Sequence, residues 1–420
     1  DSCMTLERAF KKQGIKVMTG ASVESVTETC DGQVRASVKN SKGQEEEITA
    51  DVCLVAIGVK PVVPAAPGLD LELTDDGLVK WLQRRVIPKN RAYVAEILKT
   101  YGLSVNDTKG IIDVCKGLSL NDSYWVVPQG FTGTFAQYNL YENRFSEILS
   151  LVAYTGIGQS DADFTTSPEL TTNGMLPKAW RFIEGEGIYL YKGGTFGAAN
   201  TGNEPYSEFY ASQVAQAMGL DAVAYELENW KGILASRCKL FTDINTAYIP
   251  IGRIVREGGL KACLEYYRQL GPEAYEQIKS MLVFDAVIYN EDRHFGNFGV
   301  LRDNHTGKVT GAAPVFDNGM SLFNFAMPED FQDLDSYAKT RGTAYSVSFE
   351  SVCQEVRGPI QARQLRKLIG FTFHRHPRLN WPEYRLEAIE RHLQKRVRQL
   401  LELAPELRRR QEIKQRDLER

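Results

Sequence analysis

The sequence predicts an α+β protein with a strand-rich part, a mainly helical part and a small incomplete α/β fragment in front of both. Short alternating strands joined by turns fill most of residues 15–58. Strand patterns return between residues 180 and 241, and apolar residues at helical spacing dominate from residue 259 to residue 403. The chain has 420 residues, which exceeds one ordinary hydrophobic core, so we expect two or three domains.

Composition limits the class of protein. The chain is 43% hydrophobic and 25% charged, as is usual for globular proteins. A formal net charge of -3 gives no reason to expect direct nucleic-acid binding, and no apolar run approaches the roughly 18 residues of a membrane span. The 7 cysteines are scattered without a Cys-x-x-Cys pair, so we expect free, mostly buried thiols and a cytoplasmic protein.

Residues 1–80 have the pattern of a truncated α/β domain. We expect a helix over residues 6–14 and strands near residues 15–17, 23–26, 34–38, 47–48 and 51–58. This order resembles the second half of the nicotinamide-binding domain of dihydrolipoamide dehydrogenases and related flavin disulfide reductases. The Gly-x-Gly-x-x-Gly turn that holds a pyrophosphate and the paired redox cysteines are both missing from the sequence. The resemblance therefore implies a non-catalytic fragment, and an oxidoreductase is the weakest alternative for the chain.

Pro61, Pro64 and Pro67 mark a linker-like stretch, so we place a domain boundary between Pro61 and Trp81. The region after it is predicted to be helical, with helices over residues 90–101 and 107–116 that end at glycines and a strand over residues 124–127. Residues 106–110 are expected to form a helix N-cap rather than a phosphate-binding nest. We divide the chain into a fragment (1–68), a linker (69–80), an accessory subdomain (81–160), a strand-rich lobe (161–250), a mainly helical lobe (251–405) and a charged tail (406–420).

The most informative stretch is the polar octet at residues 290–297, Asn-Glu-Asp-Arg-His-Phe-Gly-Asn, which follows a predicted helix over residues 272–289. Asp292 and Asn297 stand five apart, and a short predicted strand over residues 314–316 then ends at Asp317. Phosphoryl transfer needs an acid that orients the attacking hydroxyl, oxygen ligands for magnesium and a cation on the phosphates. An Asp and an Asn five residues apart would occur about once by chance in a chain of this length. The pair is therefore informative only in combination with the helix before it and Asp317 after it.

A second informative stretch combines a turn with two strands. Residues 172–178 predict a flexible turn before strands over residues 180–183 and 188–192, which a hairpin turn joins. Lys192 stands at the end of the apolar strand, where its ammonium can reach nucleotide phosphates while its stem packs on the sheet. A helix over residues 208–218 and strands over residues 222–227 and 232–241 follow, then helices over residues 259–270, 349–356, 359–371 and 381–403.

Together these motifs resemble the HipA-like serine/threonine kinases over most of residues 81–400. The resemblance implies a two-lobed, divergent protein-kinase-like (lipid-kinase-like) fold with a mainly α large lobe. It also implies an ATP- and magnesium-dependent kinase that phosphorylates a protein substrate, with an antitoxin or regulator protein as a candidate partner. The alternatives are a small-molecule or lipid kinase on the same fold and a pseudokinase that serves as a binding module.

The resemblance also assigns expected roles to single residues. Asp292 would orient the acceptor hydroxyl, and Asn297 and Asp317 would bind magnesium. Lys192 would contact ATP and pair with Glu208. Gly174 and Lys178 would belong to a Gly-x-x-x-Lys phosphate loop, and Arg237 and Cys238 would belong to the hinge beneath adenine. Thr171 stands where the family has a regulatory serine, so Thr171 and Thr172 are candidates for autophosphorylation. From the residues themselves we expect a neutral His294 that hydrogen-bonds the loop backbone, an Arg293 that steadies the loop or meets phosphate, and a structural Asp285.

Overall fold

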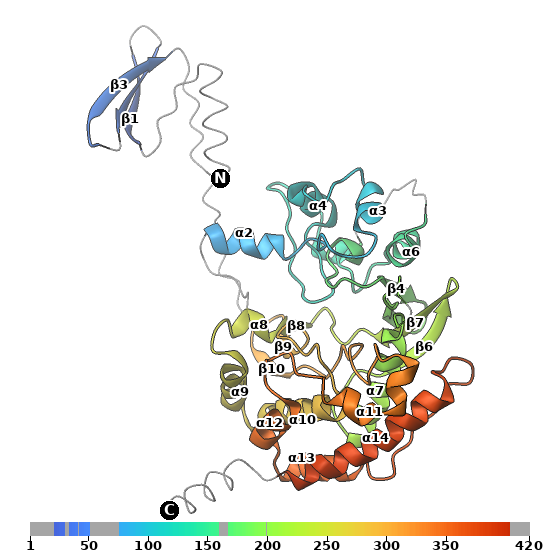
Figure 1. Ribbon diagram of the computed structural model, residues 1–420. Coiled ribbons are helices and arrows are strands. Elements are labelled where there is room, and N and C mark those ends of the chain that lie inside the picture. Colours follow the sequence, from blue (N-terminus) through green and yellow to red (C-terminus); the bar gives the residue numbers. More distant parts are fainter. Residues whose placement is uncertain are drawn as a thin grey trace, which may run out of the picture. The chain divides into compact units, whose positions relative to one another are not determined.

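The computed structural model describes residues 21–29, 33–40, 42–50, 75–158, 167–198 and 200–403 (Figure 1). The chain divides into two compact units, Asp1–Val62 and Val63–Arg420, each described by itself here. The predicted helix over residues 6–14, the strands over 15–17 and 51–58, the proline-rich stretch at residues 61–67 and the tail over 406–420 lie outside the described residues. The predicted linker over residues 69–80 is described from residue 75 onward, and there it is wrong, because helix α2 (Asp75–Gln83) begins.

The first unit contains the predicted antiparallel meander. Strands β1 (Ser22–Glu28), β2 (Val34–Lys39) and β3 (Glu45–Ala50) pair in the order β1-β2-β3. Val26 lies opposite Ala36, and Ala36 lies opposite Ile48, so the register follows the predicted alternation. Val23 and Val26 remain 61% and 43% exposed, which shows that the described part of this unit does not cover the valine face of β1.

The second unit begins with short helices: α2 (Asp75–Gln83), α3 (Val94–Lys99), α4 (Thr108–Cys115), α5 (Phe135–Tyr138) and α6 (Glu147–Thr155). The predicted N-cap is confirmed, because the Asp107 carboxylate accepts a hydrogen bond from the Gly110 amide at 2.8 Å. The predicted strand over residues 124–127 is wrong. The Val126 amide bonds to the Lys116 carbonyl at 2.7 Å, and Trp125 packs on aromatic rings including Phe131 instead of joining a sheet.

A four-stranded antiparallel sheet follows the 3-10 helix η1 (Pro168–Leu170). It consists of β4 (Lys178–Ile183), β5 (Gly187–Lys192), β6 (Tyr225–Trp230) and β7 (Ile233–Lys239) in the order β4-β5-β7-β6. Tyr191 and Trp230 pack with Ile97 and Leu149 of the accessory helices on one face of the sheet. Helix α7 (Glu204–Met218), which ends at Gly219 as predicted, contacts β6 and β7. The accessory helices and the sheet therefore share one hydrophobic core.

Three strands escaped prediction. β8 (Thr246–Pro250), β9 (Gly299–Asp303) and β10 (Val309–Ala312) form a second antiparallel sheet in the order β10-β9-β8. They are only four or five residues long, and their composition gives no clear alternation. The strand expected over residues 314–316 is reduced to one parallel bridge between Val315 and Ala222.

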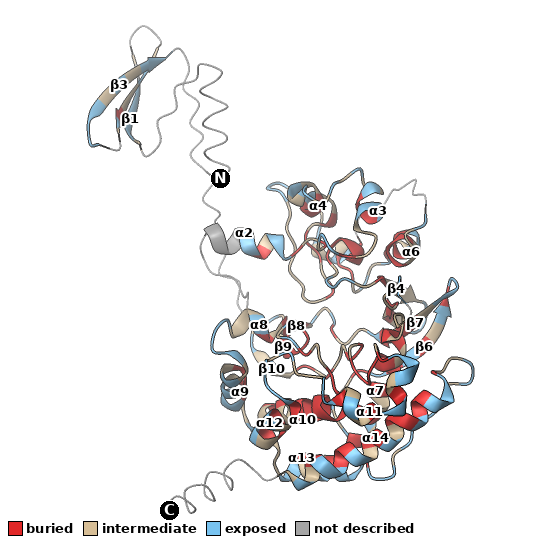
Figure 2. Ribbon diagram, viewed as in Figure 1, coloured by how far each residue is buried: buried red, intermediate tan, exposed pale blue. Residues whose placement is uncertain are grey.

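The remainder is mainly helical, as expected: α8 (Ile251–Ile254), α9 (Gly259–Leu270), α10 (Pro272–Ile288), η2 (Pro328–Gln332), α11 (Leu334–Ala338), α12 (Phe349–Val356), α13 (Pro359–Arg366) and α14 (Glu383–Glu402). Figure 2 shows that α10 is buried along much of its length, whereas buried and exposed residues alternate along α14, as in a helix that packs on the protein with one face. The predicted α+β class with a mainly helical C-terminal part is confirmed.

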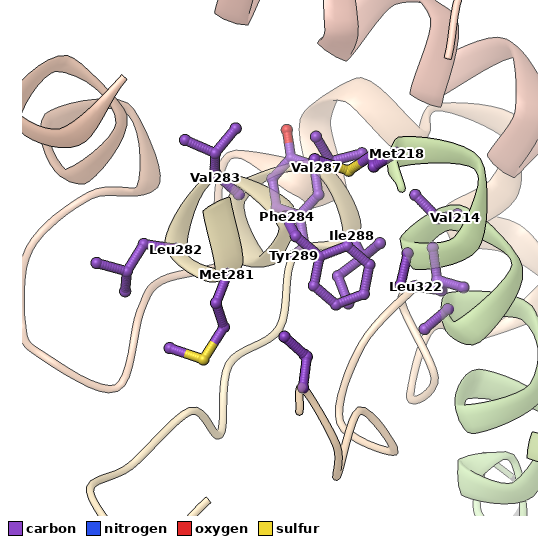
Figure 3. Close-up of a cluster of buried hydrophobic side chains, with 14 of the residues drawn as sticks. Val214, Met218, Met281, Leu282, Val283, Phe284, Val287, Ile288, Tyr289 and Leu322 are labelled. Atoms are coloured by element: carbon purple, nitrogen blue, oxygen red, sulfur yellow. The ribbon is translucent and has the colours of Figure 1, made fainter. Parts of the chain in front are cut away.

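Helix α10 forms the centre of the large core. Its residues from Met281 to Ile288 are all buried, and they pack with Val214 and Met218 of α7 and with Leu322 (Figure 3). A helix that is apolar on all sides is stable only when other elements enclose it. The end of α10 is therefore a rigid base for the segment that follows.

Two findings complete the description. The four cysteines in the described ranges, Cys115, Cys238, Cys263 and Cys353, are free and buried, as expected. None of the described helices combines the length and the apolar character needed to cross a membrane.

Candidate active site

The polar octet leaves the end of α10 through a left-handed residue, Tyr289, with φ of 54°. Asn290 then turns back, since its amide donates to the Asp285 carbonyl at 3.0 Å and its side-chain oxygen accepts the Asp292 amide at 3.1 Å. Amide-to-carbonyl bonds from His294 to Asp292 and from Asn297 to His294 close two tight turns, at 2.8 and 2.9 Å. The backbone of the octet is thus fixed by its own hydrogen bonds.

Arg293 is the buried hub of this region, with 1% of its surface exposed. Its guanidinium donates to the Asp285 carboxylate at 3.0 Å and to Oδ1 of Asn318 at 2.6 Å. One nitrogen, Nη1, also donates to the carbonyls of Asn297 at 3.1 Å and Asp317 at 3.5 Å. Arg293 therefore holds together the two segments that carry Asn297 and Asp317. Of the two roles expected for Arg293, the structure shows the one that steadies the loop, and Asp285 is its structural partner.

Lys192, the last residue of β5, links this strand to helix α7 and to the segment that carries Asp317. Its Nζ lies 2.5 Å from Oε1 of Glu208 on α7 and 2.6 Å from Oδ1 of Asp317. The second oxygen of Glu208 accepts the Asn318 amide at 2.7 Å. The ion pair that we predicted between Lys192 and Glu208 is present, and Asp317 shares the same ammonium group.

Burial disfavours the charged form of each group in this cluster, and the neighbouring opposite charges counteract that effect. Burial alone would lower the pKa of Lys192, but Asp317 and Glu208 outweigh it and raise that pKa. Burial raises the pKa of Glu208 even though Lys192 opposes the shift. For Asp317 burial acts in the same upward direction, but the positive charges of Lys192 and Lys178 hold its pKa well below the usual range. Asp317 is therefore the carboxylate that stays charged.

Asp292 and Asn297 are linked across the octet. Nδ2 of Asn297 donates to the Asp292 carbonyl at 2.9 Å, so the amide oxygen of Asn297 is turned away from that carbonyl. Burial raises the pKa of the half-buried Asp292 carboxyl, His294 opposes this shift, and the nearby charge of Asp317 adds to it. The expected contact of His294 with the loop backbone is confirmed, because its Nδ1 accepts the Gly296 amide at 3.0 Å.

Asn297 and Asp317 could each offer a side-chain oxygen to a magnesium ion shared with a nucleotide. The Asn297 amide oxygen is available, and the Asp317 side chain is 37% exposed with Lys192 bound to its Oδ1 only. Magnesium in nucleotide sites usually takes one or two protein oxygens, water and substrate phosphates. Within the described residues, no three His, Cys, Asp or Glu side chains gather as a closed metal site.

The turn at residues 171–178 closes over Lys178. Nζ of Lys178 donates to the Asn173 carbonyl at 2.9 Å, and a Cβ added at Gly174, where φ is +94°, would lie 2.1 Å from that Nζ. Only glycine fits this position without rearrangement. Burial, together with the positive charges of Lys192 and Arg91, lowers the pKa of Lys178 to about 7. Gly174 and Lys178 thus lie side by side within the turn, and their role as a phosphate loop stays a prediction.

Both candidate phosphorylation sites are engaged in this conformation. The Thr171 hydroxyl donates to the Leu118 carbonyl at 2.8 Å, and the side chain is 5% exposed. The Thr172 hydroxyl donates to the Pro168 carbonyl at 2.6 Å and accepts the Trp180 indole N–H at 3.0 Å. Autophosphorylation at Thr171 or Thr172 stays a prediction, and it requires this segment to leave its present position.

The two predicted hinge residues lie on opposite faces of β7. Cys238 is on the face of Lys192, and burial raises the pKa of its thiol to about 12. The Arg237 side chain is on the other face, where it pairs with Glu226 at 2.6 Å. The two side chains are separated in this way because neighbouring residues of a strand alternate between faces. That Arg237 and Cys238 belong to a nucleotide hinge stays a prediction.

Other residues of the site were not anticipated. Oδ1 of Asn318 accepts a hydrogen bond from the Arg293 guanidinium, and the hydroxyl of buried Tyr225 accepts one from the Asp317 amide at 3.1 Å. Asn318 belongs to the predicted turn, so its position was available from the sequence. Arg91, which contacts the 171–178 turn, and its partner Glu169 are 78 positions apart and carried no local signal.

Comparisons with known proteins give a family match to the N-terminal part of the chain and several similar solved structures. Residues 3–83 match a family described as pyridine nucleotide-disulphide oxidoreductase. This match agrees with the resemblance that we drew for the N-terminal fragment. No curated protein matches the chain.

Two solved structures are similar to the chain at low sequence identity. The proinflammatory kinase CtkA of Helicobacter pylori has 18% identity and a TM-score of 0.45, covering 55% of this chain and 91% of its own. HipA of a Shewanella oneidensis MR-1 toxin–antitoxin system, solved with HipB and operator DNA, has 11% identity and a TM-score of 0.46, covering 91% of this chain and 95% of its own.

Proposed function

We propose that residues 81–403 form an ATP- and magnesium-dependent serine/threonine protein kinase of the HipA-like type. The observation that carries this proposal is the buried ammonium of Lys192, held at 2.5 Å from Glu208 and 2.6 Å from Asp317. A lysine paired with a helix glutamate and adjacent to a metal-binding aspartate is the arrangement that phosphoryl transfer in kinases requires. Arg293 supports it by fixing the Asp317 segment against the octet.

The proposed roles follow from charge and position. Lys192 and Lys178 are the two lysines whose positive charges lower the pKa of Asp317, and they would bind the phosphates of ATP. Asn297 and Asp317 would hold magnesium, which supplies neutralisation of the phosphate charge when bound. Asp292 would accept a hydrogen bond from the acceptor hydroxyl, with its backbone fixed by Asn290 and Asn297.

The acceptor remains a proposal from resemblance. A protein serine or threonine is our leading assignment, and a lipid or small molecule is the alternative on the same site. We propose an antitoxin or regulator protein as partner. The similar HipA structure contains its own partners, HipB and operator DNA.

Nucleotide binding tests the proposal. Saturating MgATP at about 100 times its dissociation constant should stabilise the protein by roughly 2.7 kcal/mol, which a thermal shift detects. Asp317→Asn should remove the magnesium dependence of this shift, since it lacks the charged oxygen that we assign to the metal. Asp113→Asn is the matched control, because Asp113 is exposed on α4 and pairs with Lys109. A shift with NADH and none with MgATP would contradict the proposal.

A further inference from the structure

A single arginine of the accessory segment ties both ends of the 171–178 turn. Nη1 of Arg91 donates to the Thr172 carbonyl at 3.2 Å, and Nη2 donates to the Lys178 carbonyl at 2.6 Å. Arg91 lies between α2 and α3, and it is separated from these partners by 81 and 87 positions. The guanidinium therefore spans the turn from its second residue, Thr172, to its last, Lys178.

Arg91 is itself fixed by a fully buried carboxylate. Nη2 lies 2.6 Å from Oε2 of Glu169, and both side chains are 0% exposed. The other oxygen of Glu169 accepts the Trp180 amide of β4 at 2.7 Å. A buried ion pair contributes little net stability after desolvation, but it imposes a geometry because each remaining hydrogen-bonding group must be matched. This pair is thus suited to fix one conformation of the turn.

Two further contacts from the accessory segment hold the same turn. The Ala92 amide donates to the Met175 carbonyl at 2.8 Å, which secures the tip. The Leu118 carbonyl accepts the Thr171 hydroxyl at 2.8 Å, which secures the start. The accessory segment therefore contacts the turn at its start, tip and end, with Arg91 as the one charged group among these contacts.

We propose that Arg91 is a positioning residue for nucleotide binding: it holds the 171–178 turn over Lys178 in the shape that receives the phosphates, so the accessory segment sets the affinity for ATP. This inference rests on the proposed function. Arginine suits the role because its planar fork donates in several fixed directions, whereas a lysine ammonium cannot reach Thr172, Lys178 and Glu169 together in that geometry. Arg91 touches no phosphate in this scheme and acts through the turn.

The consequence is a selective loss of phosphate binding. The turn contributes to the phosphate side of the site, so disordering it should weaken MgATP and leave adenosine nearly unaffected. General damage to the fold would weaken both ligands. The ratio of the two affinities therefore separates a positioning role from a merely structural one.

The test compares Arg91→Lys and Glu169→Gln with wild type in the full chain. We expect calorimetry to show roughly tenfold or greater weakening for MgATP and less than about twofold for adenosine in both variants. Arg396→Lys is the matched control: Arg396 is also buried and bonds to a carbonyl, that of Ala286, but it lies on α14 and should change neither affinity. Hydrogen exchange of residues 171–178 in nucleotide-free protein should speed up in the two test variants and not in the control.

The outcomes are distinguishable. If wild type binds no MgATP, the proposed function fails and the inference fails with it. If wild type binds MgATP but Arg91→Lys and Glu169→Gln bind it within about twofold of wild type, or lose adenosine equally, the positioning role alone is overturned. If Arg91→Lys does not fold, Glu169→Gln decides, because glutamine keeps the side-chain size and the oxygen that accepts the Trp180 amide.

Discussion

Removing the ammonium of Lys192 should leave two carboxylates without their shared cation. Nζ lies 2.5 Å from Glu208 and 2.6 Å from Asp317, and the Glu208 side chain is 1% exposed. In Lys192→Met a side chain of similar length fills the space without the charge. Breaking a buried ion pair by removing one partner costs about 3–5 kcal/mol, and we expect a loss of unfolding free energy of that size near neutral pH.

The loss should depend on pH with a defined sign. Burial raises the pKa of Glu208 and Lys192 opposes that shift, so without Lys192 the pKa rises further. A group whose pKa is higher in the folded state contributes stability below its unfolded-state pKa and loses it as the pH rises through the folded-state value. Lys192→Met should therefore be nearest to wild type at about pH 5 and most destabilised at about pH 7.5.

Urea unfolding at both pH values measures this effect. The double variant Lys192→Met/Glu208→Gln should recover part of the loss at neutral pH, because a neutral amide needs no counter-charge. Lys109→Met is the control: the Lys109 side chain is 86% exposed and pairs with Asp113, so its removal should be without measurable effect. A loss that is equal at both pH values, or a double variant no more stable than the single one, would refute the reasoning.

Three further outcomes follow from the site. Gly174→Ala puts a Cβ 2.1 Å from Nζ of Lys178 at a φ of +94°, so calorimetry should show roughly tenfold weaker MgATP binding; unchanged binding contradicts this. Because the pKa of Lys178 is about 7, its ammonium loses its proton as the pH rises, and MgATP affinity should fall between about pH 6 and 8. A similar fall in the Lys178→Met variant would exclude Lys178 as the cause. Arg293→Gln leaves Asp285 buried without its cation and should cost about 3–5 kcal/mol in urea unfolding; a loss below about 1 kcal/mol is incompatible with a hub role.

Much of the fold could be predicted because local patterns determine it. Apolar residues at helical spacing lead into a polar octet, which predicts a half-buried helix with a loop at its end; the structure shows that helix α10 is fully buried from Met281 to Ile288. The hairpin of β4 and β5 shows alternation and a glycine-containing turn, and Lys192 stands at its last position. In contrast, β8, β9 and β10 are too short for their periodicity to exceed chance.

The site could be predicted only where its parts are marked locally. Asp292, Asn297 and Asp317 stand at a helix end and beside a turn, and Glu208 stands on a helix that follows the lysine strand. The orientation of Arg237 depends on which face of β7 meets Lys192, and this is set by pairing with distant strands. The Arg91–Glu169 pair joins residues 78 positions apart, so folding alone brings them together.

Transfer of labelled phosphate from ATP tests the central claim most directly. With magnesium and γ-labelled ATP, wild type and Asp113→Asn should transfer label to serine or threonine of a protein, either the chain itself or an added protein mixture. Asp292→Asn should lose on the order of 10²- to 10⁴-fold in rate, because its amide no longer orients the hydroxyl as a carboxylate does. Binding of MgATP without any transfer by wild type, or equal transfer by Asp292→Asn, would contradict the account.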